Sequence, residues 1–177
     1  MSADGLGPGP AEHEYRAGGF AFRVRADAPE VATLLDRLLA PFRASEGETD
    51  RTPVTYHVTG HPEAPDLWSA SWGGDQDVTR IDLPTMVDRI MWEVTQGAIG
   101  AGAYLALHSG AVSWQDRAVL LPAPSGSGKS TLAAGLTWAG CSYLTDELAM
   151  VDPETAHVVP FPRPLWMVPA SIELLPG

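Results

Sequence analysis

Cysteine, lysine and long apolar runs are scarce in this chain of 177 residues. The single cysteine, Cys141, excludes an intramolecular disulfide framework and a multi-cysteine zinc site. The longest apolar stretch, residues 98–107, is interrupted by Gly100 and Gly102 and is too short to cross a bilayer. The first residues carry neither the basic nor the apolar segment of a secretory signal. We therefore expect a cytoplasmic protein without a membrane partner.

Positive charge is also scarce. The formal net charge is −11, and Lys129 is the only lysine among the 11 cationic side chains. A nucleic-acid partner requires clustered Lys and Arg side chains that neutralise phosphates, and the sequence contains no basic run. The charge pattern therefore argues against nucleic acid as a partner. The hydrophobic fraction of 45% is that of an ordinary globular protein.

The first part of the chain predicts a small α+β region at residues 16–103, after a flexible tail at residues 1–15 that is rich in Gly and Pro. Alternating apolar residues predict short strands at 20–24, 54–58, 67–72 and 78–81. Apolar residues at helical spacing predict a helix over 31–39 and a second helix that begins near Pro84. Nothing in this region has the spacing of a catalytic site.

Residues 104–177 carry the candidate chemistry. Strand-like stretches at 105–114 and 118–121 flank a turn, and a glycine-rich loop follows them. A helix then runs to Gly140, which is placed as its C-terminal stop. The loop, called the candidate phosphate loop below, consists of Ala123, Pro124, Ser125, Gly126, Ser127, Gly128, Lys129, Ser130 and Thr131.

This loop fits the Walker A pattern with Ala123 in place of the leading glycine. Gly126 and Gly128 permit positive φ angles, so that consecutive amide groups can point at phosphate oxygens. Lys129 can follow the β- and γ-phosphates, and the Ser130 hydroxyl can ligate Mg²⁺. The alternative is a glycine-rich turn without a ligand. We disfavour it because the loop follows an apolar strand, precedes a helix and holds the only lysine.

Two further features lie near the loop in sequence. Asp146 and Glu147 follow the strand that comes after the helix, where a kinase can place a base or a metal ligand. Their alternative role is a solvated acidic turn. His108 precedes the hairpin that leads into the loop, and a lone histidine in an apolar segment is more often a core residue than a functional one.

Together these features resemble HPr serine kinase/phosphorylase and its relatives. The resemblance rests on Leu107-His-Ser-Gly-Ala-Val112, on the candidate phosphate loop, and on Tyr143-Leu-Thr-Asp-Glu147. It implies an α/β fold with a P-loop kinase-like core of the HPr kinase type, complete or truncated at its C-terminus, over residues 104–177. It also implies ATP and Mg²⁺ as cofactors and a serine of a protein or peptide as the acceptor. Members of the family form hexamers, so the resemblance allows a homo-oligomer.

The resemblance also implies a role for each site residue. Asp146 is the general base for the acceptor hydroxyl, and His108 lies beside the transferring phosphoryl group. Lys129 holds the phosphates, and Ser130 ligates Mg²⁺ with help from Glu147. The chain departs from the family at the ends of the loop and at Glu147, where the family usually has Asp. No segment after residue 164 matches the family's further metal-binding signature.

Two other functions stay open at this point. The first is a small-molecule kinase of the shikimate-kinase type, which also has an acid on the strand after its first helix. In those enzymes the loop lies near the N-terminus, whereas here it begins at Ala123. The second is a nucleotide-binding regulatory module without turnover.

Overall fold

The computed structural model describes residues 13–45, 52–72, 78–165, 167, 169–173 and 175. The chain divides into two units, Met1–Gln96 and Gly97–Gly177. The boundary falls inside helix α2 (Leu83–Gly100), earlier than the boundary expected before residue 104. None of the described helices is both long enough and apolar enough to cross a membrane.

The first unit is built on a five-stranded sheet in the order β1-β2-β3-β4-β5. Its strands are β1 (Glu14–Ala17), β2 (Phe20–Ala26), β3 (Val54–His61), β4 (Ala64–Ser71) and β5 (Val78–Asp82). Strand β1 lies partly within the stretch expected to be a tail, whose residues 1–12 fall outside the described part of the chain. Strands β2 and β3 pair in parallel, so they need a crossover, which α1 (Pro29–Leu39) and the 3₁₀ turn η1 (Ala40–Phe42) supply.

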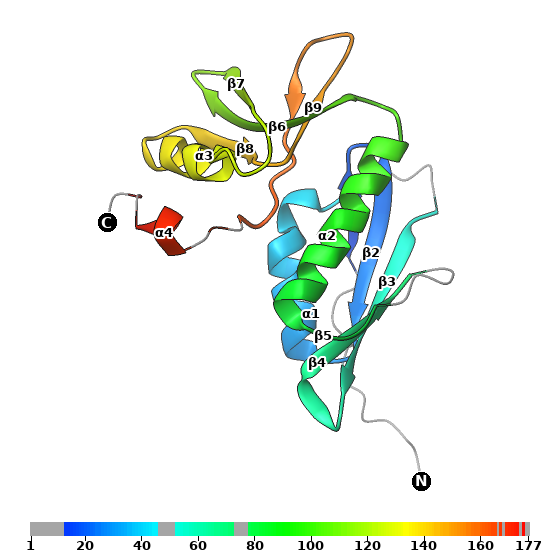
Figure 1. Cartoon of the computed structure of the whole chain (residues 1–177). Helices are drawn as coiled ribbons and strands as arrows, with labels where there is room; N and C mark the ends of the chain where they lie inside the picture. Colours follow the sequence, from blue (N-terminus) through cyan, green and yellow to red (C-terminus); the bar gives the residue numbers. More distant parts are fainter. Residues whose placement is uncertain are drawn as a thin grey trace. The chain divides into compact units, whose positions relative to one another are not determined.

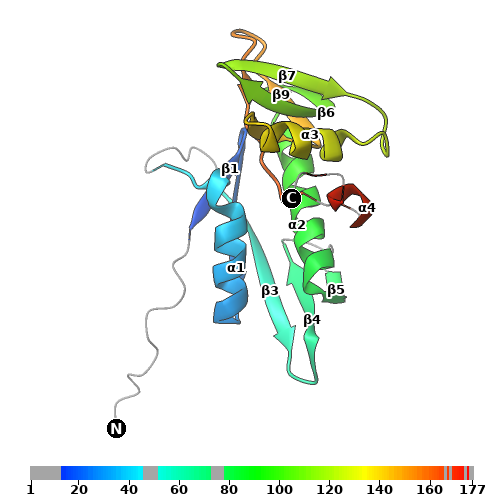
Figure 2. The same ribbon diagram turned by 90° about the vertical axis from the view of Figure 1, so that its left-hand side faces the viewer.

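Helices α1 and α2 lie on the same face of this sheet (Figures 1 and 2). The strand register decides which side chains they cover. Phe22 pairs with Val54 on the helix side, whereas Arg23 pairs with Thr55 on the opposite, polar side. The core between the sheet and the helices is formed by buried side chains of Tyr15, Phe22, Val31, Leu35, Tyr56, Val58, Met86, Ile90 and Val94.

The second unit is organised around the long strand β6 (Leu105–Trp114). The other elements of this unit are β7 (Arg117–Pro122), α3 (Lys129–Trp138), β8 (Ser142–Thr145), β9 (Leu148–Val151), β10 (Val158–Val159) and α4 (Pro169–Ile172). The sheet order is β10-β9-β6-β7, and β8 also pairs with β6. Strands β7, β8 and β9 all pair antiparallel with β6, and β10 pairs antiparallel with β9.

The expectation of a P-loop kinase-like core is therefore wrong. The described residues form a mixed α/β structure with two five-stranded sheets, and the sheet that carries the loop contains antiparallel pairs only. The turn between β6 and β7 gives the physical reason. Gln115 and Asp116 both have positive φ, 49° and 59°, as in the two-residue turns that close antiparallel hairpins. The hairpin fixes β7 against β6, and β8 and β9 then pair along the other edge of β6.

Two adjacent leucines of α1 test the core of the first unit. Leu35 is 3% exposed and faces the sheet, whereas Leu34 is 38% exposed. We expect Leu35→Ala to lower the free energy of unfolding by about 2–5 kcal/mol, because it removes a buried side chain and leaves a cavity. Leu34→Ala should cost well under half as much. Urea denaturation of both variants measures the difference, and equal losses would contradict the assigned helix face.

Candidate functional site

The strand register brings three segments together at one end of the second sheet. Strands β7 and β8 both run antiparallel to β6, so their carboxyl ends lie at the same end of it. Pro122 at the end of β7 pairs with Ser109, and Thr145 at the end of β8 pairs with Ala111. The candidate phosphate loop and the two acids therefore flank the same part of β6, next to His108.

The loop has the backbone conformation that its glycines predict. Gly126 and Gly128 have φ angles of +77° and +91°, where an L side chain is strained. Helix α3 begins directly afterwards, with Gly128 at its N-cap and no side-chain cap bond. The first amide groups of a helix have no partner within it, and the helix dipole is positive at this end. Such an arrangement suits an anion.

Lys129 folds back over this loop. Its Nζ donates to the carbonyl oxygens of Ala123 at 2.9 Å and Pro124 at 3.1 Å, and it lies 3.2 Å from Nε2 of His108. The side chain is 9% exposed. An ammonium group has three protons and no acceptor site, so these three contacts use its full capacity.

The contact with Lys129 fixes the tautomer of His108. Because the ammonium can only donate, Nε2 of His108 accepts and its proton resides on Nδ1. Nδ1 lies 3.4 Å from Oε1 of Glu147. A carboxylate, an imidazole and an ammonium therefore stand in a row from Glu147 to Lys129. The side chains of His108 and Glu147 are each about half exposed.

Asp146 is held in a different way. It is 7% exposed, and its two carboxylate oxygens accept hydrogen bonds from two hydroxyl groups. Ser130 donates to Oδ2 at 2.7 Å, and Tyr143 donates to Oδ1 at 2.8 Å. Burial, and after it the neighbouring charge of Asp146, raise the pKa of the Tyr143 hydroxyl above its usual range. Tyr143 therefore keeps its proton and remains a donor.

The turn that carries the two acids is fixed by Thr145 and by β6. The buried hydroxyl of Thr145 accepts the amide protons of Glu147 at 3.3 Å and Leu148 at 3.2 Å. The carbonyl of Glu147 accepts the amide proton of Ser109 at 3.2 Å. These bonds turn the side chains of consecutive acids to different partners, so Asp146 meets Ser130 and Glu147 meets His108.

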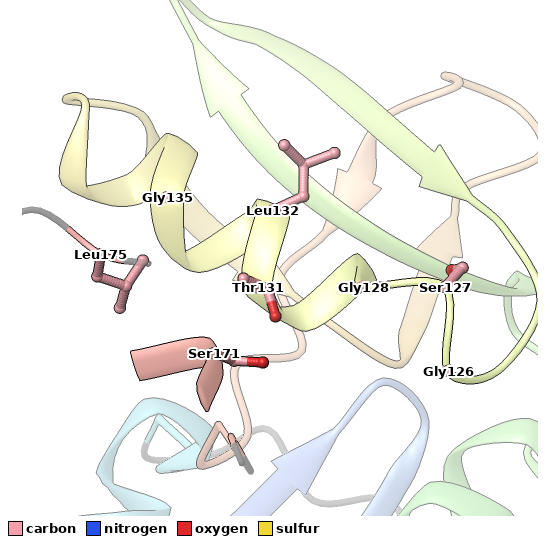
Figure 3. Close-up of a pocket in the computed structure, with 8 residues that line it drawn as sticks. All are labelled: Gly126, Ser127, Gly128, Thr131, Leu132, Gly135, Ser171 and Leu175. Atoms are coloured by element: carbon pink, nitrogen blue, oxygen red, sulfur yellow. The ribbon is translucent and has the colours of Figure 1, made fainter. Parts of the chain in front are cut away.

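The structure thus gathers five of the residues singled out from the sequence: His108, Lys129, Ser130, Asp146 and Glu147. Asp146 lies beside Ser130, whereas the resemblance implies that Glu147 assists Ser130. Ser127 and Thr131 line a groove next to the loop (Figure 3). Tyr143 and Thr145 belong to the stretch that carries the resemblance, but no site role was predicted for them. The sequence feature that could have indicated such a role is that both residues carry a hydroxyl group and shortly precede Asp146 in the chain.

A metal ion has a small set of oxygen donors at this place. Ser130 and Asp146 bring a hydroxyl and a carboxylate to within 2.7 Å of each other. Within the described residues, no group of three or more His, Cys, Asp or Glu side chains could hold a metal. Mg²⁺ at nucleotides needs no such cage, because it binds one or two protein oxygens and completes its shell with phosphates and water. The donors present therefore fit Mg²⁺ on a nucleotide.

Comparison with known proteins gives no match to a family model, to a curated protein or to a solved structure. The function of this site has to be inferred from its own contacts.

The hydroxyl of Tyr143 gives a test of the buried carboxylate. Tyr143→Phe removes one donor from Asp146 and leaves the ring in place. We expect a loss of about 1–3 kcal/mol in the free energy of unfolding, the usual cost of a lost bond to a buried charged group. Tyr104→Phe, in the same unit, is the control and should cost less than about 0.5 kcal/mol, as a change outside such a network does. Urea denaturation of both variants measures these losses. An unchanged midpoint for Tyr143→Phe would show that the hydrogen bond to Asp146 does not contribute to stability.

Proposed function

We propose that the candidate phosphate loop binds the phosphates of ATP with Mg²⁺, and that the protein transfers the γ-phosphoryl group to a hydroxyl. The activity is that of a kinase of the HPr serine kinase/phosphorylase type, with a serine of a protein or peptide as the acceptor. The observation that carries this proposal is the position of Lys129. The only lysine of the chain is held over a glycine-rich helix start, with His108 beside it.

Lys129 is suited to exchange its partners for phosphate. Its present acceptors are two neutral carbonyl oxygens and a neutral imidazole nitrogen. Hydrogen bonds from an ammonium to a charged oxygen are about twice as strong as bonds to neutral acceptors. A phosphate within reach therefore draws the ammonium away from Ala123 and Pro124. His108 lies beside Lys129 on the loop side, and Oε1 of Glu147 lies 3.4 Å from Nδ1 of His108.

Mg²⁺ would be held by the Ser130 hydroxyl, together with the phosphates and water. When bound, the ion neutralises part of the charge that builds up on the phosphates during transfer. The Ser130 hydroxyl supports this role, because Mg²⁺ prefers hard oxygen ligands, and the negative charge of the adjacent Asp146 favours a cation there.

Asp146 is the proposed general base. Its Oδ2 already accepts a hydroxyl proton from Ser130 at 2.7 Å, so the carboxylate is oriented to receive O–H groups, and Tyr143 keeps it in place through Oδ1. In the proposed reaction the acceptor oxygen forms a bond to the γ-phosphorus while the bond between this phosphorus and the bridging oxygen breaks. The acceptor proton passes to Asp146, and ADP leaves.

Lys129→Ala tests nucleotide binding. The variant removes the only ammonium group at the loop, and no other lysine can replace it. We expect affinity for Mg·ATP to fall by about 2–3 kcal/mol, which is roughly thirtyfold to a hundredfold or more. Calorimetric titration of both proteins measures the change, and circular dichroism checks that the variant is folded. Equal affinities of the two proteins for Mg·ATP would rule out phosphate binding by the loop, and with it the proposed function.

Asp146→Asn tests transfer. The amide keeps the shape of the carboxylate but cannot take the acceptor proton, so we expect the rate to fall by about 10²–10⁴-fold. Glu147→Gln is the matched control, since it changes the neighbouring acid, and it should affect the rate far less. Intact-mass measurement with ATP and Mg²⁺ first identifies the acceptor among serine peptides and hydroxyl metabolites. Full activity of Asp146→Asn would exclude it as the base, and ATP binding without transfer to any acceptor would leave a binding module.

A further inference from the structure

A groove runs along the outer side of α3, next to the candidate phosphate loop (Figure 3). Its volume is about 500 Å³, which lies in the range of small-molecule sites. The loop contributes Gly126, Ser127 and Gly128 to its wall, so the groove begins where the loop amides are. Ser171 of α4 and Leu175 line its other side.

One face of α3 forms the floor of this groove. Gly128, Thr131, Leu132 and Gly135 recur at the spacing that places residues on the same side of a helix. Gly135 stands in the interior of α3, where glycine is less favourable than alanine. No atom outside its own helix turn lies within 4 Å of the position that a Cβ would take there. The missing side chain leaves the groove open at this point.

The lining of the groove suits an uncharged group that has both apolar surface and polar edges. Leu132, which is 51% exposed, and Leu175 supply apolar surface. Thr131 and Ser171 supply hydroxyl groups from facing sides (Figure 3). Among the described residues that line the groove, none is charged. The groove therefore differs from the loop itself, where Lys129 and the helix start favour negative charge.

We propose that this groove binds the nucleoside part of the triphosphate, with the base against the apolar side of α3 and the ribose toward the hydroxyl groups. The inference rests on the proposed function, because it takes the phosphates to lie on the loop. Gly126 and Gly128 belong both to the loop and to the groove, so a chain of phosphates on the loop amides leads into it. The nucleoside is the part of the ligand that is uncharged and directly attached to these phosphates, with an apolar base and a ribose that carries hydroxyl groups.

Gly135→Leu tests the proposal, with Gly135→Ala as its control. Leucine is a good helix former, and its side chain fills the groove; alanine adds a single methyl group where no atom is within contact distance. Both variants and the parent protein are titrated with Mg·ATP and with Mg²⁺ and inorganic tripolyphosphate. We expect Gly135→Leu to weaken ATP binding at least tenfold and to leave tripolyphosphate binding unchanged. Gly135→Ala should match the parent protein for both probes.

A second variant guards against a folding defect in the first. Leu132→Ala trims a side chain that is already half exposed, so the fold is not at risk, and we expect a severalfold loss of ATP affinity alone. The groove proposal is overturned if the parent protein binds ATP no tighter than tripolyphosphate, or if Gly135→Leu binds ATP like the parent. An equal loss of affinity for ATP and for tripolyphosphate in Gly135→Leu also overturns it, because the substitution then acts through the loop. If the parent protein binds neither ATP nor tripolyphosphate, the proposed function is wrong as well.

Discussion

The antiparallel register of β6 is the constraint on which the candidate site depends. β6 holds β7 along one edge and β8 and β9 along the other, so segments far apart in sequence are fixed to a single strand. The loop after β7 and the acids after β8 reach the same end of the sheet for this reason. A slip of β8 by one residue would turn its side chains to the opposite faces. Tyr143 and the acids that follow would then no longer meet Ser130.

This geometry buries two opposite charges beside the loop and satisfies them in different ways. A buried charge is costly unless hydrogen bonds replace its water. Asp146 receives two hydroxyl donors, and its own charge strengthens both bonds. Lys129 receives only neutral acceptors. The ammonium is therefore the group that gains most from an anionic ligand, and it stands where unpartnered helix amides add to the same preference.

Local features of the site could be predicted from the sequence because they depend on neighbours in the chain. Gly126 and Gly128 have the positive φ angles that the loop pattern demands, and α3 begins at Lys129. The sheet could not be predicted in this way. Strands β8 and β9 have four residues each, and their partner is chosen by distant pairing with β6. The contact of Tyr143 with Asp146 escaped prediction because it depends on the turn that Thr145 fixes after β8.

The chemistry of the proposed function belongs to the strand–loop–helix segment and not to one kind of sheet. Glycines with positive φ, free helix amides and an ammonium are properties of residues 117–138, and a fold by itself does not decide a function. The antiparallel setting does change what surrounds the segment. Among the described strands, β7 has β6 as its one partner, and the outer side of α3 carries Leu132 with half of its surface exposed. An organic group attached to loop-bound phosphates would cover this apolar surface, and Gly135 leaves the space for it.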